Sequence, residues 1–243
     1  MSIRVAHLCK DFSKRSETFI YDYVTELERQ GGDNHVVANE RVNPDERPFE
    51  NVTVVPWPAL WNPRRMGHRL LEELGLDGAL DSSWRELWPG AEEAIERVAP
   101  DVLHAHFGRP GVKAVPIARQ LDLPFVVTFY GYDISKLPRE RRWREAYESI
   151  WRTAQAVVVL SEEMKEAAVR LGAPPDAVRV VHLARDLDDF PYRPPSAPVS
   201  EFISVGRLTG KKGHFDAIRA VQTRMEAGDD LQLYIVGDGP QRD

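Results

Sequence analysis

The sequence predicts an α/β protein built around a parallel β-sheet. Short β-branched or apolar runs alternate with amphipathic stretches along nearly the whole chain, which is the pattern of parallel strands joined by crossover helices. Several amphipathic stretches also begin at a capping residue and stop at a glycine, as helices do. The 243 residues are enough for one large domain, or for one domain and part of another.

Strands are expected where apolar or β-branched residues follow one another in short runs. In chain order these runs are residues 3–8, 35–38, 52–55, 102–105, 125–129, 157–160, 178–181, 202–205 and 231–236. After the first run, a helix is expected to begin with Ser16 as its N-cap, to carry Glu17 in its first turn and to end at Gly31. Ser161 is expected to cap another helix, which stops at Gly172.

The pattern predicts two domains of unequal size. Residues 1–193 form the first, residues 194–200 a proline-rich linker, and residues 201–243 the start of a second. The last segment contains one βαβ unit with a helix over residues 214–225. Because a lone βαβ unit cannot bury both faces of a parallel strand pair, the second domain is expected to be incomplete.

Composition and charge exclude several classes of protein. The formal charge of −6 disfavours nucleic acid as a partner, although it leaves room for a local diphosphate site. The single cysteine, Cys9, cannot form an internal disulfide. The first twelve residues contain Arg4, His7, Lys10 and Asp11, where a signal peptide needs an apolar run. We therefore expect a reducing, cytoplasmic setting.

A cationic, glycine-rich turn at residues 206–213 is the most informative motif. Gly206 and Arg207 follow a predicted strand, and Lys211 and Lys212 lie just before the next helix, a geometry that suits a diphosphate. A solvated basic turn explains the segment alone equally well. A Walker A loop is disfavoured, because glycine follows Lys212 where Ser or Thr is required. The turn Gly237–Gly239 follows the next strand.

Other polar residues lie just past strands, where ligands bind in open α/β sheets. His104 and His106 share one strand face; a metal pair is conceivable, but no third ligand is evident and cleft lining or packing is favoured. Tyr130 and Asp133 flank a glycine and could line a cleft, although for Asp133 helix capping is favoured. No G-x-G-x-x-G follows the first strand, which counts against a dinucleotide cofactor.

Two surfaces could contact an acceptor or a membrane. The region 56–90 is rich in tryptophan and proline, which suits a sugar or lipid-linked acceptor, although core packing is the commoner role of tryptophan. The arginines around Trp143 could touch anionic lipid heads, so a peripheral contact with the inner membrane face is possible in principle, but a solvated helix face is favoured.

Taken in order, the motifs resemble the family-4 (group 1) glycosyltransferases, especially members that build bacterial exopolysaccharide or lipopolysaccharide, including colanic-acid-type transferases. The segments that carry the resemblance span essentially the whole chain: S-E-T-F-I, D-V-L-H-A-H-F-G, T-F-Y-G-Y-D, V-V-V-L-S-E-E-M, S-V-G-R-L-T-G-K-K-G and Y-I-V-G-D-G-P. The resemblance implies the GT-B fold, in which two Rossmann-like domains face a cleft, with the acceptor side in the amino-terminal one.

The resemblance also implies an activity: transfer of a sugar, with retention, from a nucleotide-sugar donor to a hydroxyl of a saccharide or lipid-linked saccharide, with no required metal or cofactor. It implies a donor-binding set and an acceptor-side set. The donor set is Ser16, Glu17, Gly206, Arg207, Lys211, Lys212, Gly237, Asp238 and Gly239, and the acceptor-side set is His104, His106, Tyr130 and Asp133.

The chain departs from the family pattern in three places. Many relatives have His where this chain has Tyr130, and Ala184 and Arg185 replace a more usual glycine-containing turn. The family's paired-glutamate motif falls beyond residue 243, so we expect this chain alone to transfer little or no sugar. The alternatives are another GT-B enzyme, such as a sugar-nucleotide epimerase or a starch-synthase relative, or a non-catalytic sugar- or partner-binding module if the gene ends at residue 243.

Overall fold

The computed structural model describes residues 2–57, 88, 90–184, 187–188, 190–192, 194 and 199–242. The chain divides into two compact units, Met1–Arg185 and Asp186–Asp243. We refer to them as unit 1 and unit 2.

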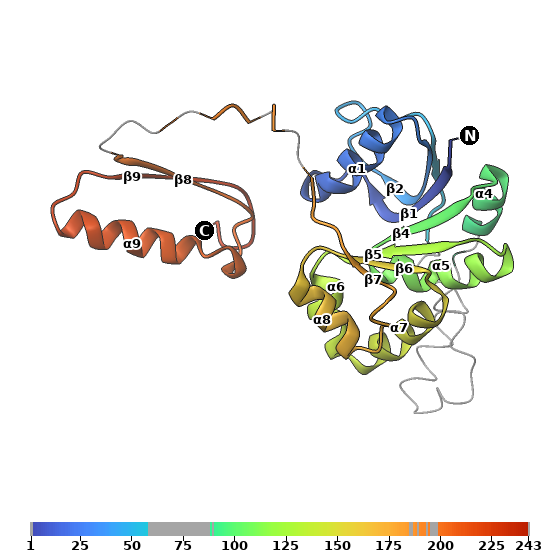
Figure 1. Ribbon diagram of the computed structural model, residues 1–243. Helices are drawn as coiled ribbons and strands as arrows, with labels where there is room; N and C mark the ends of the chain where they lie inside the picture. Colours follow the sequence, from blue (N-terminus) through green and yellow to red (C-terminus); the bar gives the residue numbers. More distant parts are fainter. Residues whose placement is uncertain are drawn as a thin grey trace. The chain divides into compact units, whose positions relative to one another are not determined.

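Unit 1 is built on a seven-stranded parallel sheet with the order β3-β2-β1-β4-β5-β6-β7 (Figure 1). The strands are β1 (Arg4–Phe12), β2 (Asp33–Arg41), β3 (Val52–Val54), β4 (Val102–His106), β5 (Phe125–Thr128), β6 (Ala156–Val159) and β7 (Val178–Val180). Each matches an apolar run of the sequence, so the predicted strands of this unit are confirmed, with ends that shift by a few residues.

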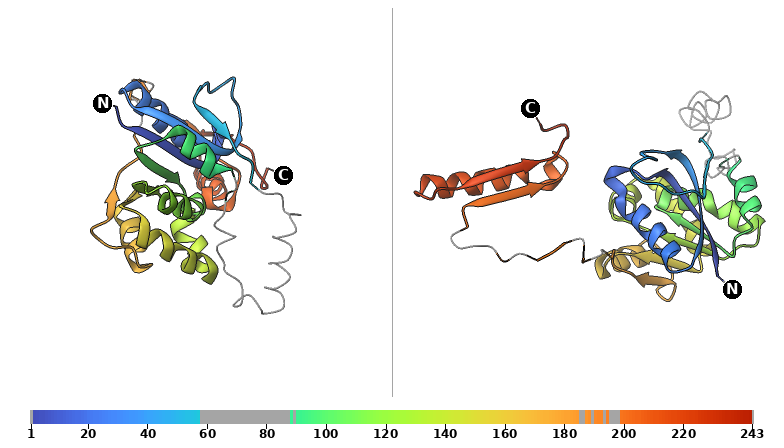
Figure 2. Two further views of the ribbon diagram at one scale, coloured as in Figure 1. Left: turned by 90° about the vertical axis from the view of Figure 1, so that its right-hand side faces the viewer. Right: turned by 90° about the horizontal axis from the view of Figure 1, so that it is seen from above.

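Helices cover the sheet of unit 1 on both faces, as a parallel sheet requires. They are α1 (Thr18–Arg29), α4 (Ala91–Val98), α5 (Gly108–Gln120), α6 (Tyr132–Ser135), α7 (Arg141–Thr153) and α8 (Glu162–Arg170). One core contains the buried apolar side chains of α4, α5 and α7, and a smaller core contains those of α1 against β1 and β2. The ribbon accordingly places α1 and α7 on opposite sides of the strands (Figures 1 and 2).

The prediction for the start of the first helix is wrong. A 3-10 turn, Arg15–Glu17, precedes α1, and it is closed by a 2.9 Å hydrogen bond from the Glu17 N–H to the Lys14 carbonyl. Ser16 lies inside this turn, and the α-helix begins at Thr18 without a side-chain cap. The chain has therefore already turned before Ser16 could act as an N-cap.

The prediction for the helix after Ser161 is confirmed. The Ser161 Oγ accepts a 3.3 Å hydrogen bond from the Met164 N–H at the start of α8. We expect Ser161→Ala to lower the free energy of unfolding by about 1 kcal/mol, because the helix loses its cap. Ser149→Ala is the matched control, since the Ser149 Oγ bonds within α7 to the Ala146 carbonyl. Equal urea midpoints for the two variants would contradict the capping role.

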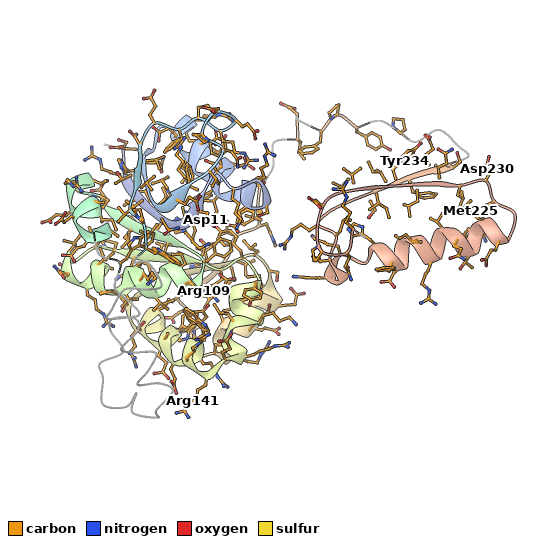
Figure 3. All side chains as sticks on the ribbon, turned by 180° about the vertical axis from the view of Figure 1, so that it is seen from behind. Asp11, Arg109, Arg141, Met225, Asp230 and Tyr234 are labelled. Atoms are coloured by element: carbon orange, nitrogen blue, oxygen red, sulfur yellow. The ribbon has the colours of Figure 1, made fainter. Side chains whose placement is uncertain are left out.

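Unit 2 is a single βαβ unit of β8 (Glu201–Val205), α9 (His214–Glu226) and β9 (Gln232–Val236). The helix lies along one face of the two parallel strands (Figure 1). Apolar side chains on all three elements are largely exposed, including Val205, Met225 and Tyr234, the last two of which are labelled in Figure 3. Within the described part of this unit, only His214 is buried. The predicted βαβ unit with its helix is thus confirmed.

Among the helices of the described residues, none combines the length and the apolar composition that a bilayer crossing requires.

Candidate functional site

In unit 1 the carboxyl ends of β1 and β4 form the topological switch point of the sheet. The chain runs outward from β1 to β2 and β3 on one side and from β4 to β7 on the other, so the connections diverge between β1 and β4. Ligands of open α/β sheets bind at such a point. Ser13 and Phe107, in the loops that leave β1 and β4, have positive φ angles of 66° and 74°. Strained backbone of this kind clusters at functional sites.

The loop after β1 carries two residues of the predicted donor set. Ser16 is exposed and Glu17 is half-buried. The Lys14 ammonium lies 3.3 Å from the Glu17 carboxylate and 3.4 Å from that of Asp11, so one cation holds the loop together. The loop therefore presents Ser16 at the edge of the switch point.

Three histidines from two neighbouring strands form a buried cluster beneath the switch point. His7 of β1 pairs in register with His104 of β4, and His106 lies two residues further along β4. Burial lowers the pKa of His7 to about 4 and those of His104 and His106 well below the usual value, so all three rings are neutral at pH 7. Each ring offers one nitrogen within 4.8 Å of the others, which supplies the third candidate metal ligand that spacing alone did not reveal.

Every ring of this cluster is engaged in hydrogen bonds. His7 Nδ1 lies 3.1 Å from His106 Nε2, and His7 Nε2 lies 3.0 Å from Asn34 Oδ1. His106 Nδ1 lies 2.7 Å from the Tyr130 hydroxyl. His104 Nε2 lies 2.8 Å from the Thr128 hydroxyl. Both predicted acceptor-side histidines are thus buried and hydrogen-bonded, and His106 contacts the predicted residue Tyr130.

The prediction that Asp133 caps the next helix is wrong, because Asp133 lies inside α6, whose N-cap is Gly131 and which has no side-chain cap. The Asp133 carboxylate accepts hydrogen bonds from the N–H groups of Tyr130 and Gly131, each at 3.0 Å, and from that of Gly108 at 3.1 Å, at the start of α5. The side chain is buried, and burial raises the pKa of Asp133 to about 6 against the opposing effect of these bonds. Asp133 therefore ties the Tyr130 turn to the beginning of α5.

In unit 2 the loops after β8 and β9 run together, backbone against backbone. The Gly206 N–H donates to the Val236 carbonyl at 3.0 Å, and the Leu208 N–H donates to the Asp238 carbonyl at 2.9 Å. A Cβ at Gly237 would lie 1.9 Å from the Gly206 carbonyl oxygen, so only glycine fits there. These contacts bring together the two glycine-rich segments of the predicted donor set.

The cations of this set gather at the beginning of α9. Lys211 and Lys212 lie in a 3-10 turn, Gly210–Lys212, and the stem of Lys212 reaches within 3.6 Å of a Cβ position at Gly206. Arg207, Lys211 and Lys212 are exposed, and in the described part of the chain no carboxylate pairs with any of them. The helix itself has no side-chain cap. Unpaired cations beside an uncapped helix amino end favour binding of an anion.

His214 holds this loop in place and was not singled out from the sequence. Its Nε2 lies 3.2 Å from the Arg207 carbonyl, and its Nδ1 lies 3.0 Å from the Ser204 hydroxyl. Because a carbonyl only accepts, the Nε2 carries a proton and donates to Arg207. A buried first residue of α9 therefore fixes the backbone that carries Arg207.

The two additional surfaces make contacts within unit 1 where they are described. The Trp88 indole is buried and donates to the Val55 carbonyl at 2.8 Å, and its ring packs edge-on against Trp57. Trp61 and Trp84 lie outside the described residues. The Arg141 side chain bonds to Glu145 at 2.6 Å and Arg142 to Glu140 at 2.8 Å, as in a solvated helix face; Figure 3 labels Arg141 at the start of α7.

Comparison with solved structures identifies the fold. The chain aligns with a lipopolysaccharide outer core galactosyltransferase, WaaB, at a TM-score of 0.63 and 15% identity, over 98% of this chain and 62% of that one. It aligns with Anabaena HepE in complex with UDP at a TM-score of 0.64 and 12% identity, over 99% of this chain and 70% of that one. The fold is therefore of the GT-B type, as the sequence predicted.

Sequence comparison identifies the family. A protein of Escherichia coli (strain K12) named as a colanic acid biosynthesis glycosyltransferase, WcaL, is 32% identical over 145 residues. The match covers 58% of this chain and 36% of that protein, so the chain corresponds to little more than a third of this relative. The profile of Glycosyltransferase Family 4 matches residues 16–189. The chain belongs to Glycosyltransferase Family 4.

Proposed function

We propose that this chain forms the acceptor side and the first part of the donor side of a glycosyltransferase that builds cell-surface polysaccharide. In this proposal a sugar passes, with retention, from a nucleotide-sugar donor to a hydroxyl of a saccharide or lipid-linked saccharide. The observation that carries it is a group of three cations, without a carboxylate partner among the described residues, beside the uncapped start of α9. The family, the relation to WcaL and the UDP bound by HepE support it.

The cationic turn would act on the leaving group. As the bond to the sugar breaks, negative charge develops on the departing nucleoside diphosphate, and fixed positive groups stabilise it. Arg207 and Lys212 would supply charge, and the N–H groups at the start of α9 would supply dipoles. Gly206 and Gly237–Gly239 would let the diphosphate approach the backbone. The reaction in this proposal needs no metal, because the cations replace it.

Residues at the switch point of unit 1 would also act on the reacting groups. Ser16 and Glu17 would approach the diphosphate, while His106 and Tyr130 would line the acceptor side. His104 and Asp133 would support that side from the interior.

The exposed apolar faces of unit 2 are relevant to whether this chain alone can transfer sugar. Since side chains such as Val205 and Tyr234 lack a core to pack into, we propose that the active enzyme contains further chain that completes this domain. The 243-residue chain alone would then transfer little sugar.

The test is an assay with labelled nucleotide-sugars, including UDP-glucose, on this chain and on the product of the complete reading frame, each with EDTA. We expect turnover by the complete product and little by the chain, with the anomeric configuration of the product retained by NMR. Turnover by the chain equal to that of the complete product would refute the fragment proposal. A complete reading frame that ends at residue 243 and binds sugar without transfer would favour a binding module.

A further inference from the structure

A single chain of hydrogen bonds connects the surface carboxylate of Glu28 to the hydroxyl of Tyr130. Glu28 is exposed near the end of α1, and its Oε2 lies 2.9 Å from Asn34 Nδ2 and 3.1 Å from the Asn34 backbone N. From Asn34 the hydrogen bonds continue through His7 and His106 to Tyr130. The three intervening side chains are buried, with exposed fractions of 0% each. This series of hydrogen bonds therefore crosses the interior between α1 and the carboxyl ends of the strands.

The contact with the Glu28 carboxylate fixes the direction of the first two hydrogen bonds. A carboxylate only accepts, so the Asn34 amide nitrogen must face it and donate. The Asn34 Oδ1 then faces His7 and must accept from Nε2, which carries the proton of that ring. Because burial keeps His7 neutral, its Nδ1 has no proton and can only accept.

The same reasoning fixes the direction of the remaining two hydrogen bonds. The Nδ1 of His7 accepts, so the proton on the 3.1 Å bond belongs to His106 Nε2. His106 is also neutral, which leaves its Nδ1 as an acceptor for the 2.7 Å bond from Tyr130. The only proton of the Tyr130 hydroxyl is thus committed to His106.

The aromatic ring of Tyr130 is held between two other rings. Phe19 of α1 lies 4.5 Å away between ring centroids and Phe107 lies 4.6 Å away. Tyr130 is half-buried and follows β5 at the carboxyl end of the sheet. The hydroxyl is therefore fixed in orientation both by the rings and by His106.

We propose that Glu28 and Asn34 are positioning residues that make Tyr130 a hydrogen-bond acceptor toward its substrate, so that Tyr130 recognises a sugar hydroxyl and not an anionic group. The proposal rests on the proposed function for its substrate, a sugar.

The hydrogen-bond chain also decides between two uses of the histidine cluster. A metal bound by all three rings would need the Nδ1 of His7 and the Nε2 of His106 both free of protons. In the proposed chain the His106 Nε2 carries a proton directed at His7. The two arrangements therefore differ in one proton, which NMR detects.

The first experiment measures the tautomers on the full 243-residue chain with ¹⁵N-labelled histidine at pH 7. We expect His7 and His106 to be neutral with the proton on Nε2, and to be unchanged by one equivalent of Zn²⁺. Glu28→Ala should shift both toward a tautomer mixture, whereas Glu28→Gln, which keeps an acceptor oxygen, should preserve the wild-type pattern. A proton on Nδ1 of either ring, or stoichiometric Zn²⁺ binding by the three rings, would overturn the proposal.

The second experiment is a double-mutant cycle on the complete protein, with the nucleotide-sugar that it turns over as the probe. We expect Tyr130→Phe to lower kcat/KM by about 5- to 10-fold, because one neutral hydrogen bond is lost. Glu28→Ala should lower it by roughly 3-fold alone and have no effect in the Tyr130→Phe background. The control Glu26→Ala removes another exposed glutamate of α1 and should leave kcat/KM unchanged.

The outcomes separate this proposal from the proposed function. Additive effects of the Glu28 and Tyr130 substitutions would overturn the positioning role even if transfer is robust. Absence of transfer from every nucleotide-sugar would overturn the proposed function and the sugar-binding role of Tyr130, while the NMR result would still decide the direction of the hydrogen bonds.

Discussion

Replacing Arg207 or Lys212 by alanine is expected to lower kcat/KM for sugar transfer by the complete protein by about 10²- to 10³-fold each. The reason is that fixed charges aimed at a departing diphosphate act mainly in the transition state, where removal of one such group has effects of this size. Both side chains are exposed at the start of α9 and lack a carboxylate partner within the described residues. Their charge is therefore available to a ligand.

The matched control for these variants is Arg219→Ala. Arg219 is an exposed arginine on α9, so its loss changes the net charge of unit 2 equally without touching the turn. We expect its kcat/KM to stay within about 2-fold of wild type. If Arg207→Ala and Lys212→Ala behave like Arg219→Ala, the turn is a solvated basic loop and the donor site lies elsewhere.

The second large effect is an expected loss of folding stability at acidic pH. The folded pKa of His7 is about 4, against an ordinary value of 6.5, and those of His104 and His106 are also lowered by burial. Below pH 6.5 the unfolded chain therefore binds more protons at these rings than the folded chain. Their stabilising effect is complete above pH 6.5 and is lost as the pH falls toward 4.

Asp133 has the opposite effect on stability over an overlapping pH range. Its folded pKa of about 6 exceeds the ordinary 3.8, so between pH 4 and 6 the folded chain binds more protons at this carboxyl than the unfolded chain. With three histidines and one opposing carboxyl, we expect a net uptake of about two protons on unfolding near pH 5. The free energy of unfolding should then fall by about 3 kcal/mol for each unit that the pH falls.

The measurement is urea unfolding of the chain between pH 4.5 and 7, followed by the fluorescence of the buried Trp88 and Trp151 in unit 1. Asp133→Asn removes the opposing group and should steepen the dependence to about three protons near pH 5. His182→Gln, at an exposed position, should leave the slope unchanged. A wild-type slope of zero, or one of opposite sign, would show that the three rings are not buried in neutral form.

Much of the fold follows from local patterns in the sequence. Apolar runs such as residues 157–160 have to be buried on both faces, so strand positions in a parallel sheet are readable without knowledge of the partner strands. The Ser161 cap and the Gly172 stop are equally local signals. The glycine-rich loops of unit 2 are predictable for the same reason, since Gly206 and Gly237 each follow a strand directly.

The interior of the candidate site depends on contacts that spacing does not encode. His7 and His106 are 99 positions apart in sequence and meet only because β1 and β4 are neighbours in register. The available signal was a polar residue, His7, in the middle of an apolar strand run, which calls for a buried partner. Ser16 does not cap α1, because it lies inside the 3-10 turn that precedes the helix. The sequence did not predict this turn, since it has no clear sequence signature.

We expect the donor diphosphate to bind at the cationic turn of residues 206–213. The most direct measurement is a crystal structure of the complete protein with UDP. We expect diphosphate oxygens about 3 Å from the Arg207 and Lys212 side chains. UDP bound elsewhere, with the turn in contact with solvent alone, would contradict the account.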